Sequence, residues 1–455
     1  MTARLLFVVA SLLVGLAQIA HADFAAAVAA YERQDFAAAF GEFRELAELG
    51  HAASQENLAV MYVKGEGTKR DNVLGYAWAR LALEQGGGEA ADGIVTQLEP
   101  RLDDAARQRV TELTDRFGQA ALQARILPAV SLAPSAPRCR MRRPVNPNDY
   151  YPKEVEPRGS PGSVIIEMTV MPDGRARNPR TIASIPPDIF DEAARRVGLD
   201  TLYVAAEENG VPVRCRFRFK VKFGRDDPSM AALKTKLEEM RKEALAGRSA
   251  SQLLLARLLQ LYPGLSPGEN PVGWYLKAAQ GGSPAAQFVV GYETCNGGDF
   301  ARDEAKGRFW LEQAARHGNA DAQVALANYL ARPGETPAEH RRALELLELA
   351  VVSGAVDARY HLAAFLAAGP EADLREPRRA LALLKGVVRD MNRNASGFEI
   401  RAAAHAMLGE FADAQKDQKK AIELANTLGW DLKPLRERLD RYAARQTWTG
   451  ELMIY

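Results

Sequence analysis

A glycine that recurs at an interval of 36 residues constrains the fold of this 455-residue chain more than any other feature. It stands at five positions, which are Gly50, Gly86, Gly282, Gly318 and Gly354. Because glycine tolerates left-handed backbone angles, it commonly follows the last turn of a helix and lets the chain reverse. Reversals at a fixed spacing predict stacked helical hairpins, since a single hairpin cannot bury its own apolar face.

The residues around the glycine repeat with it. A large apolar side chain stands eight residues before it, at Trp78, Trp274, Trp310 and Leu346. Alanine stands four residues before it, at Ala82, Ala278, Ala314 and Ala350, and four after it, at Ala286, Ala322 and Ala358. Residues four apart lie on one face of a helix, so this alternation of large and small side chains predicts helices that interlock along a seam.

These residues resemble the Sel-one-like repeat, a short relative of the tetratricopeptide repeat. The N-terminal copy carries the pattern most fully, with His51-Ala52-Ala53, then Met61-Tyr62-x-x-Gly65-x-Gly67, then Asp71. The resemblance covers about 23–100 and 248–390. Residues 408–421 look like half a tetratricopeptide repeat, and we expect a capping helix at 434–445. The resemblance implies a scaffold that holds partner proteins, and it does not imply catalysis.

The sequence between the two helical blocks differs from them in composition and hydrophobic pattern. Prolines concentrated in 127–149 predict an extended linker. Strand-rich residues follow at 163–171 and 180–185, and Pro172-Asp173-Gly174 between them is a turn signal. We expect a helix from Pro187 to about Gly198, and a last strand at 211–223 after the turn Asn209-Gly210. This order predicts a small α+β unit.

The last strand alternates apolar and basic residues. Its apolar set is Cys215, Phe217, Phe219, Val221 and Phe223, and its basic set is Arg214, Arg216, Arg218, Lys220 and Lys222. A period of two places the apolar set on the core face and the basic set on the other face. The surrounding stretch, 138–225, holds 17 Lys or Arg and 11 Asp or Glu. The basic face is either a patch for an anionic partner or a solvated face that protects an edge strand from aggregation, and we expect the second.

The insert resembles the C-terminal domain of TonB-type energy transducers over about 148–224. The matching pieces are Tyr151-Pro152, Gly162-x-Val164, Pro172-Asp173-Gly174-Arg175, Phe190-x-x-Ala193-Ala194 and Asn209-Gly210-x-Pro212-Val213. In that family the domain binds outer-membrane receptors, which add a short strand to the edge of its sheet. The resemblance implies partner-binding residues at Tyr150, Tyr151, Pro152, Pro212, Arg214, Arg216, Phe217, Arg218, Phe219 and Lys220.

Three departures from that family weaken the case for force transduction. One is that a chain whose N-terminal signal is cleaved would have no membrane anchor through which force could reach it. The aromatic-Pro segment that normally follows the helix reads Leu202-Tyr203-Val204-Ala205-Ala206 here. The long Pro/Lys/Glu-rich spacer of the family is replaced by the short linker. We therefore expect recognition of a peptide or partner by this fold rather than full energy transduction.

The first 22 residues predict a secretory signal. Arg4 precedes the apolar stretch 5–20, and Ala20-His21-Ala22 fits a cleavage site. The stretch is shorter than the roughly 20 residues of a spanning helix. We therefore expect cleavage, a periplasmic location and no stable membrane span afterwards. The alternative is an uncleaved inner-membrane anchor.

The cysteines bear on the same compartment. In an oxidising environment Cys139 and Cys215 could form a disulfide that links the linker to the sheet. The alternative is two unrelated buried thiols. Cys295 would then be unpaired, as a small buried residue in a repeat turn.

Other kinds of chemistry find little support in the sequence. The six histidines show no zinc-ligand spacing, and no P-loop or nucleophile elbow occurs. A net charge of +1 predicts no general attraction to nucleic acid. We therefore expect no enzyme, no cofactor, no metal and no nucleic-acid partner. An envelope hydrolase is the least favoured class.

The expected fold is mainly α, an α-solenoid of helical-hairpin repeats in two blocks interrupted by a small α+β domain. The expected segments are a signal peptide (1–22), N-terminal repeats (23–126), a Pro-rich linker (127–147), the TonB C-terminal-like domain (148–225), helical repeats (226–390) and a tetratricopeptide-like hairpin with a capping helix (391–455). The expected function is a periplasmic scaffold or adaptor for proteins or peptides of the cell envelope, with a TonB-like peptide-binding module. The alternative is an accessory or divergent energy transducer in TonB-dependent transport, with outer-membrane receptors as partners.

Overall fold

The computed structural model describes residues 23–455 apart from 132–138, 156–160, 173, 175, 187, 209, 225–229, 355–356, 386–394, 428–431, 451 and 453–455. The expected signal peptide, 1–22, lies outside the described residues, as do the turn residues Asp173, Arg175 and Asn209 and the helix-start residue Pro187. The chain divides into two compact units. Unit 1 comprises residues up to 129 with 239–253 and 273–287, and unit 2 comprises 130–238, 254–272 and 288–455.

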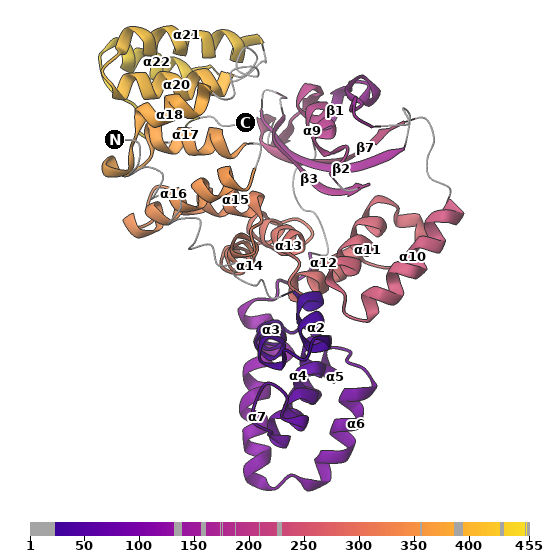
Figure 1. The fold of residues 1–455 in the computed structure, drawn as a ribbon. Coiled ribbons are helices and arrows are strands. Elements are labelled where there is room, and N and C mark those ends of the chain that lie inside the picture. Colours follow the sequence, from indigo (N-terminus) through magenta and orange to yellow (C-terminus); the bar gives the residue numbers. More distant parts are fainter. Residues whose placement is uncertain are drawn as a thin grey trace. The chain divides into compact units, whose positions relative to one another are not determined.

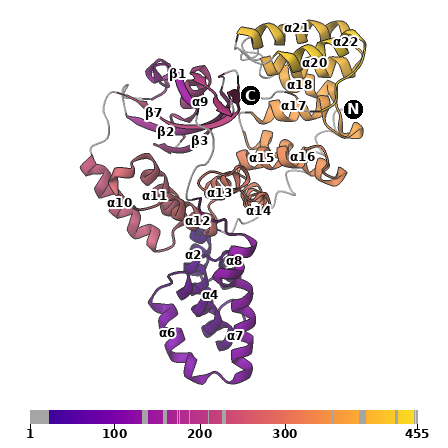
Figure 2. The ribbon, with the colours of Figure 1, turned by 180° about the vertical axis from the view of Figure 1, so that it is seen from behind.

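Unit 1 begins with a run of helices, shown in indigo and purple in Figure 1 and from behind in Figure 2. They are α2 (Phe24–Glu32), α3 (Phe36–Glu48), α4 (Ala52–Lys64), α5 (Asn72–Glu84), α6 (Glu89–Leu98), η1 (Glu99–Arg101), α7 (Asp104–Phe117) and α8 (Gln119–Arg125). Aspartates start several of them, because a carboxylate can accept the free N–H groups of a first turn. Asp71 accepts from the backbone N–H groups of Val73 and Leu74, both at 3.0 Å. The expected seam is present, with Trp78 and Ala82 buried.

Residues from both sides of the insert complete unit 1. The insert is followed by α10 (Met230–Leu245), α11 (Ser249–Leu261), η3 (Pro263–Leu265), α12 (Pro271–Gln280) and α13 (Pro284–Asn296). Gln280 Nε2 donates to the Leu49 carbonyl at 2.9 Å, and Ser249 Oγ donates to the Asp23 carboxylate at 3.0 Å. Within unit 1, helices from before and after the insert therefore pack as one stack, which the sequence had left open.

The repeat glycines adopt the left-handed backbone that their spacing predicts, with φ between +77° and +89°. Gly247, with φ +85°, makes the same reversal between α10 and α11. A buried glutamine five residues after the glycine donates Nε2 to the carbonyl three residues before it, which satisfies an acceptor left free at the helix end. These bonds are Gln55–Ala47, Gln252–Ala244, Gln287–Ala279 and Gln323–Ala315, at 3.0–3.2 Å.

His51 is buried at the centre of unit 1. Its Nε2 donates to the Gly247 carbonyl at 3.0 Å, which leaves Nδ1 to accept from Ser54 Oγ at 2.8 Å. Burial lowers the pKa of His51 to about 4, although the bond to Gly247 opposes the shift. The ring is therefore a neutral packing group that ties α4 to the turn between α10 and α11.

Acidification is expected to destabilise unit 1 through His51. An unfolded imidazole binds its proton near pH 6.5, and the folded ring binds it only near pH 4. The unfolded state thus binds more protons between these values, so stability present at pH 7 is lost as the pH falls, by up to about 3 kcal/mol. Urea unfolding from pH 7.5 to 4.5 measures this loss. The His51→Gln variant should be less stable at pH 7 but should lack this part of the slope, and identical slopes for the two proteins would contradict the assignment.

Unit 2 contains the remaining repeats. Its helices after α13 are α14 (Glu304–Arg316), α15 (Ala320–Leu330), α16 (Pro337–Val352), α17 (Ala358–Ala368), η4 (Ala372–Leu374), α18 (Pro377–Lys385), α20 (Ala395–Met407), α21 (Phe411–Thr427) and α22 (Lys433–Ala443). The repeat residues Trp310 and Leu346 are buried in it. Thr336 and Glu339 form a reciprocal capping box at the start of α16. The expected C-terminal capping helix is α22, with Pro434 in its first turn.

The insert folds in unit 2 as a three-stranded antiparallel sheet with one covering helix, α9 (Asp191–Asp200). The sheet has the order β3-β2-β7, from β2 (Gly162–Val170), β3 (Ala176–Ile185) and β7 (Cys215–Phe223). Two small ladders accompany it: β1 (Arg140–Arg143) with β4 (Leu202–Val204), and β5 (Ala206–Glu208) with β6 (Val211–Val213). A short helix, η2 (Pro147–Tyr150), precedes β2.

Three details of the insert differ from the sequence expectations. Residues 140–143, expected in the extended linker, form β1 because β4 offers them a pairing partner. The last strand is interrupted at Arg214, since β6 pairs with β5 whereas β7 pairs with β2. The helix begins at Asp191, later than expected. In the part of the chain that the structure describes, no helix combines the length and apolar character needed to cross a bilayer.

Candidate functional site

The central strand of the insert is buried on both faces. Eight of the nine residues of β2 are buried. Val164 and Ile166 lie on the face that packs against α9, whereas Ile165 and Glu167 lie on the opposite face. In Figure 1, α9 lies over one side of the sheet and repeat helices lie on the other. The repeats therefore complete the burial of this sheet within unit 2.

Six charged residues form what we call the ion cluster. They are Glu167 on β2, Arg180 on β3, Arg216 and Arg218 on β7, Glu293 on α13 and Asp299 in the following loop. Arg216 Nη2 lies 2.7 Å from Glu167 and 2.8 Å from Glu293. Arg218 reaches Glu167 at 2.8 Å, Glu293 at 3.1 Å and Asp299 at 2.8 Å. The three guanidinium groups thus face three carboxylates, and this balance is what allows charge to be buried.

The ion cluster corrects our expectation of a solvated basic face. Glu293 has no exposed surface, and Arg180 pairs with both Glu167 and Glu293 while its guanidinium lies 3.4 Å from the centre of the Tyr292 ring. Burial alone would raise the pKa of Glu167, but Arg180, Arg218 and Arg216 outweigh burial and hold that pKa well below its usual range. The basic face of β7 is therefore largely a contact with the repeats.

Lys220 continues this contact along β7. Its Nζ donates to the Leu261 carbonyl at the end of α11, at 3.1 Å, and lies 3.7 Å from the centre of the Tyr262 ring. Beside it, Ile165, Ile182 and Leu261 form a small apolar cluster. Polar and apolar contacts together attach this sheet face to repeat helices of unit 2.

The apolar face of β7 lies where the alternation predicts. Cys215, Val221 and Phe223 are buried in the core of the insert, and Phe217 and Phe219 pack partly buried against it. Tyr203 from β4 contacts Phe217 at a centroid distance of 5.3 Å. The residues that stand in place of the usual aromatic-Pro segment thus cover the two phenylalanines.

The segment Tyr150-Tyr151-Pro152 lies near the C-terminal end of β7. The Tyr151 ring packs edge-on against Phe190, 5.5 Å between centroids, and Phe190 stacks on Phe223 at 5.0 Å. Tyr150 donates its hydroxyl to Asp200 at 2.7 Å, and burial together with this bond raises its pKa to about 12. Tyr150 and Tyr151 therefore lie near the Phe223 end of β7, whereas the expected residues Pro212 and Arg214 lie next to its Cys215 end.

Strand β7 is one of the two edge strands of the described sheet, the other being β3, and it is the edge that the family resemblance implies for a partner. Among the strands that the structure describes, β7 pairs with β2 and is the last strand on its side. Arg214, just before β7, is exposed, as are Pro212 on β6 and Lys222 near the end of β7. An edge strand presents backbone donors and acceptors to which an extended peptide can pair.

A disulfide joins Cys139 to Cys215, with their Cα atoms 6.0 Å apart. Cys139 immediately precedes β1, and Cys215 is the first residue of β7. The bridge therefore ties the small β1–β4 ladder to the start of the edge strand. Cys295 is a buried free thiol, and it lies in the last turn of α13 rather than in a turn between helices.

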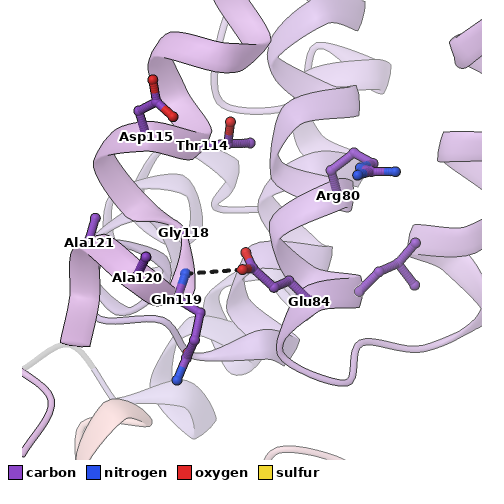
Figure 3. Close-up of a pocket in the computed structure, with 9 residues that line it drawn as sticks. Arg80, Glu84, Thr114, Asp115, Gly118, Gln119, Ala120 and Ala121 are labelled. Carbon is purple, nitrogen blue, oxygen red and sulfur yellow. Dashed lines mark hydrogen bonds between the residues drawn. The ribbon is translucent and has the colours of Figure 1, made fainter.

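A pocket of about 630 Å³ lies between α5 and the α7–α8 junction in unit 1. Figure 3 shows Glu84 pointing from α5 toward the start of α8, where the backbone N–H of Gln119 donates to its carboxylate at 3.3 Å. Gln85 and Gln119 join the same helices through a 2.8 Å side-chain bond. These polar groups secure the junction, so we interpret the pocket as structural.

Three potential metal ligands, His405, Glu410 and Asp413, have ligand atoms within 4.8 Å of one another in the described part of unit 2. His405 Nδ1 already lies 2.6 Å from a Glu410 carboxylate oxygen. This pair stabilises the α20–α21 turn, and we assign no metal to it.

The contacts and topology define a helical-repeat protein with an inserted antiparallel sheet, and comparisons with known proteins agree. Residues 147–224 match the family described as Gram-negative bacterial TonB protein C-terminal. Residues 52–87, 272–283, 284–319 and 320–351 match the Sel1 repeat. The chain therefore contains a TonB C-terminal domain and Sel1 repeats. Both kinds of module serve protein–protein interaction in the families that match.

Two solved structures resemble the chain distantly. One is a protective antigen present in uropathogenic Escherichia coli strains and displaying an SLR fold, with 16% identity, 90% of this chain and 76% of that chain covered, and a TM-score of 0.35. The other is a Sel1 repeat protein from Oxalobacter formigenes, with 21% identity, 43% and 78% covered, and a TM-score of 0.31. No curated protein matches the chain.

Proposed function

We propose that this protein is a periplasmic scaffold whose TonB-type sheet accepts an extended peptide of an envelope protein along the outer edge of β7. The observation that carries the proposal is that the chain itself covers both faces of the sheet, whereas β7 pairs only with β2 among the described strands. Backbone pairing at an edge needs no free face, so the repeats and the peptide can engage the sheet together.

The expected binding residues divide into two roles under this proposal. Arg216, Arg218 and Lys220 contribute backbone groups to the edge, because their side chains are held by the ion cluster and by the end of α11. The flanking residues contribute side chains. They are Tyr150, Tyr151, Pro152, Pro212 and Arg214. Phe217 and Phe219 support the strand from its core face.

Photo-crosslinking in cells tests the edge. A benzoylphenylalanine placed at Lys222 should form crosslinks to a discrete partner, because this position is exposed on β7. The same residue at Glu423, an exposed position on α21, serves as the control. Crosslinks of equal yield at both positions, or none at Lys222, would reject the edge as the docking site.

The alternative function is an accessory or divergent energy transducer in TonB-dependent transport. The match of residues 147–224 to the TonB C-terminal family favours it. Mass spectrometry of the Lys222 crosslinks separates the two functions: outer-membrane receptors alone support transport, and other envelope proteins support the scaffold. Sequencing the mature N-terminus adds a second criterion, because a protein that retains Met1 or Thr2 would carry the anchor that a transducer needs.

A further inference from the structure

Unit 2 contains a cavity of about 1140 Å³ between the insert and the repeats. We call this cavity the cleft. One wall comes from β3 and α9, and the other comes from α13, α15 and α17. In both Figure 1 and Figure 2, β3 faces α15 and α17. The volume slightly exceeds the upper limit of small-molecule sites, about 1,000 Å³, which leaves room for several residues of an extended peptide.

The cleft combines an apolar lining with a few charged groups, as binding sites commonly do. Phe288, Tyr292, Val324 and Phe365 line the cleft from the repeat side, with Phe288 and Phe365 largely buried. Asn328 on α15 and His361 on α17 join across this wall, with His361 Nδ1 3.1 Å from Asn328 Oδ1. Burial lowers the pKa of His361 to about 4, so this ring adds no positive charge at neutral pH.

Negative charge predominates in the lining. The carboxylates are Asp188, Asp191, Glu192, Asp321 and Asp357, and the guanidinium groups are Arg180, Arg195 and Arg332. All three arginines have a carboxylate partner: Arg180 pairs with Glu167, Arg195 with Glu192 and Arg332 with Glu304. Asp321 and Asp357 are therefore available to a cation from outside.

The pKa of Asp357 responds to these acidic neighbours. Its surroundings in the cleft desolvate it and raise its pKa to about 6, with Glu192 and Asp321 adding to the shift and Arg195 opposing it. Asp321 on α15, Asp357 just before α17 and Glu192 on α9 all line the cleft, so both of its walls contribute acidic groups. A bound ammonium or guanidinium group would relieve their repulsion.

The chain's own C-terminal tail already occupies one end of the cleft. Gly450 donates its backbone N–H to the Ala368 carbonyl at the end of α17, at 2.8 Å. Leu452 is buried in the same apolar cluster as Phe365 and Ala368. One backbone hydrogen bond thus holds Gly450 here and one apolar contact holds Leu452, and we expect a peptide to bind in the same manner.

We propose that the cleft binds an extended peptide with a lysine or arginine next to an apolar residue. The cation lies at Asp321 and Asp357, and the apolar side chain packs on the surface around Phe288 and Phe365. The inference rests on the proposed scaffold function and adds a second peptide site, separate from the β7 edge. It places the binding specificity in residues that come from both the insert and the repeats.

Fluorescence anisotropy with the full-length mature chain tests the cleft. The probes are two labelled octapeptide pools with randomised flanks, one fixed at its centre as Lys-Leu and the other as Glu-Leu. The Lys-Leu pool is expected to bind at least tenfold more tightly. The double variant Asp321→Asn/Asp357→Asn should lose this preference, and Asp357→Lys should favour the Glu-Leu pool. Asp373→Asn, an exposed change outside the lining, is the matched control and should bind as wild type does.

Each other outcome counts against the proposal. Equal binding of the two pools, or no effect of the double variant in a protein with unchanged circular dichroism, would overturn it. Competition by spermidine as effective as that by unlabelled Lys-Leu pool would show a simple cation site and reject the peptide. Failure of the cleft is distinguishable from failure of the β7 edge, because the Lys222 crosslink reports on the edge alone.

Discussion

Replacing Glu293 by glutamine is expected to lower the free energy of unfolding of unit 2 by about 3–5 kcal/mol, the range for removing one partner from a buried ion pair. Glu293 has no exposed surface and faces Arg180, Arg216 and Arg218. Without it, three guanidinium groups would share Glu167 and Asp299, and unpaired positive charge would remain buried. Urea unfolding at pH 7 measures the loss.

A local readout distinguishes detachment of the insert from general unfolding. Hydrogen exchange in β7 and β2 should accelerate in the Glu293→Gln variant before exchange in α20 and α21 does, because the ion cluster holds the sheet to α13. Glu423→Gln, which removes an exposed pair with Lys420, is the control and should cost less than about 1 kcal/mol. A loss for Glu293→Gln as small as that of the control would refute a stabilising role for the cluster.

Removing the Cys139–Cys215 disulfide is expected to cost about 4 kcal/mol. The bridge closes a loop with a sequence separation of 76 residues, and loop-closure entropy in the unfolded chain gives a cost of this size. The double variant Cys139→Ala/Cys215→Ala should therefore show a lower unfolding midpoint in urea. Its β1–β4 ladder should also exchange faster, because the bridge ties that ladder to β7.

Reduction supplies the control for the disulfide prediction. A reductant should lower the stability of the wild-type protein to that of the double variant and should leave the double variant unchanged, since the remaining Cys295 is unpaired and buried. A wild-type protein with the same midpoint in oxidising and reducing buffer would show that the bridge adds nothing to stability.

Much of the fold could be predicted because it is encoded locally. The 36-residue interval located glycines whose left-handed backbone depends only on the adjoining helix end. The alternation in 215–223 gave the orientation of β7 because a strand has a fixed period. The 36-residue pattern did not identify Gly247, because this glycine stands 35 residues before Gly282. In addition, Glu239 occupies the position eight residues before it, where the other repeats have a large apolar residue. The buried glutamine five residues after the glycine is the signal that would have found it.

The environment of the basic face could not be predicted because it is encoded far away. Glu293 and Asp299 come from the repeats, more than 70 residues after Arg216 and Arg218, and an alternating basic strand looks the same whether water or a carboxylate lies opposite. The strand at 140–143 was missed for a related reason. Its arginine-rich residues, flanked by prolines, have little strand character without β4 beside them.

The long sequence distance across unit 1 has a consequence for biogenesis. A span of 231 residues separates Leu49 from Gln280, and 196 separate His51 from Gly247. Because a chain is synthesised from its N-terminus, the first helices exist for the whole time that the insert takes to be made before the groups that cover them arrive. Closing so long a loop is slow compared with forming a local hairpin. We therefore expect the seam around His51 to close late, so that chains ending before residue 247 expose apolar helix faces that full-length chains bury.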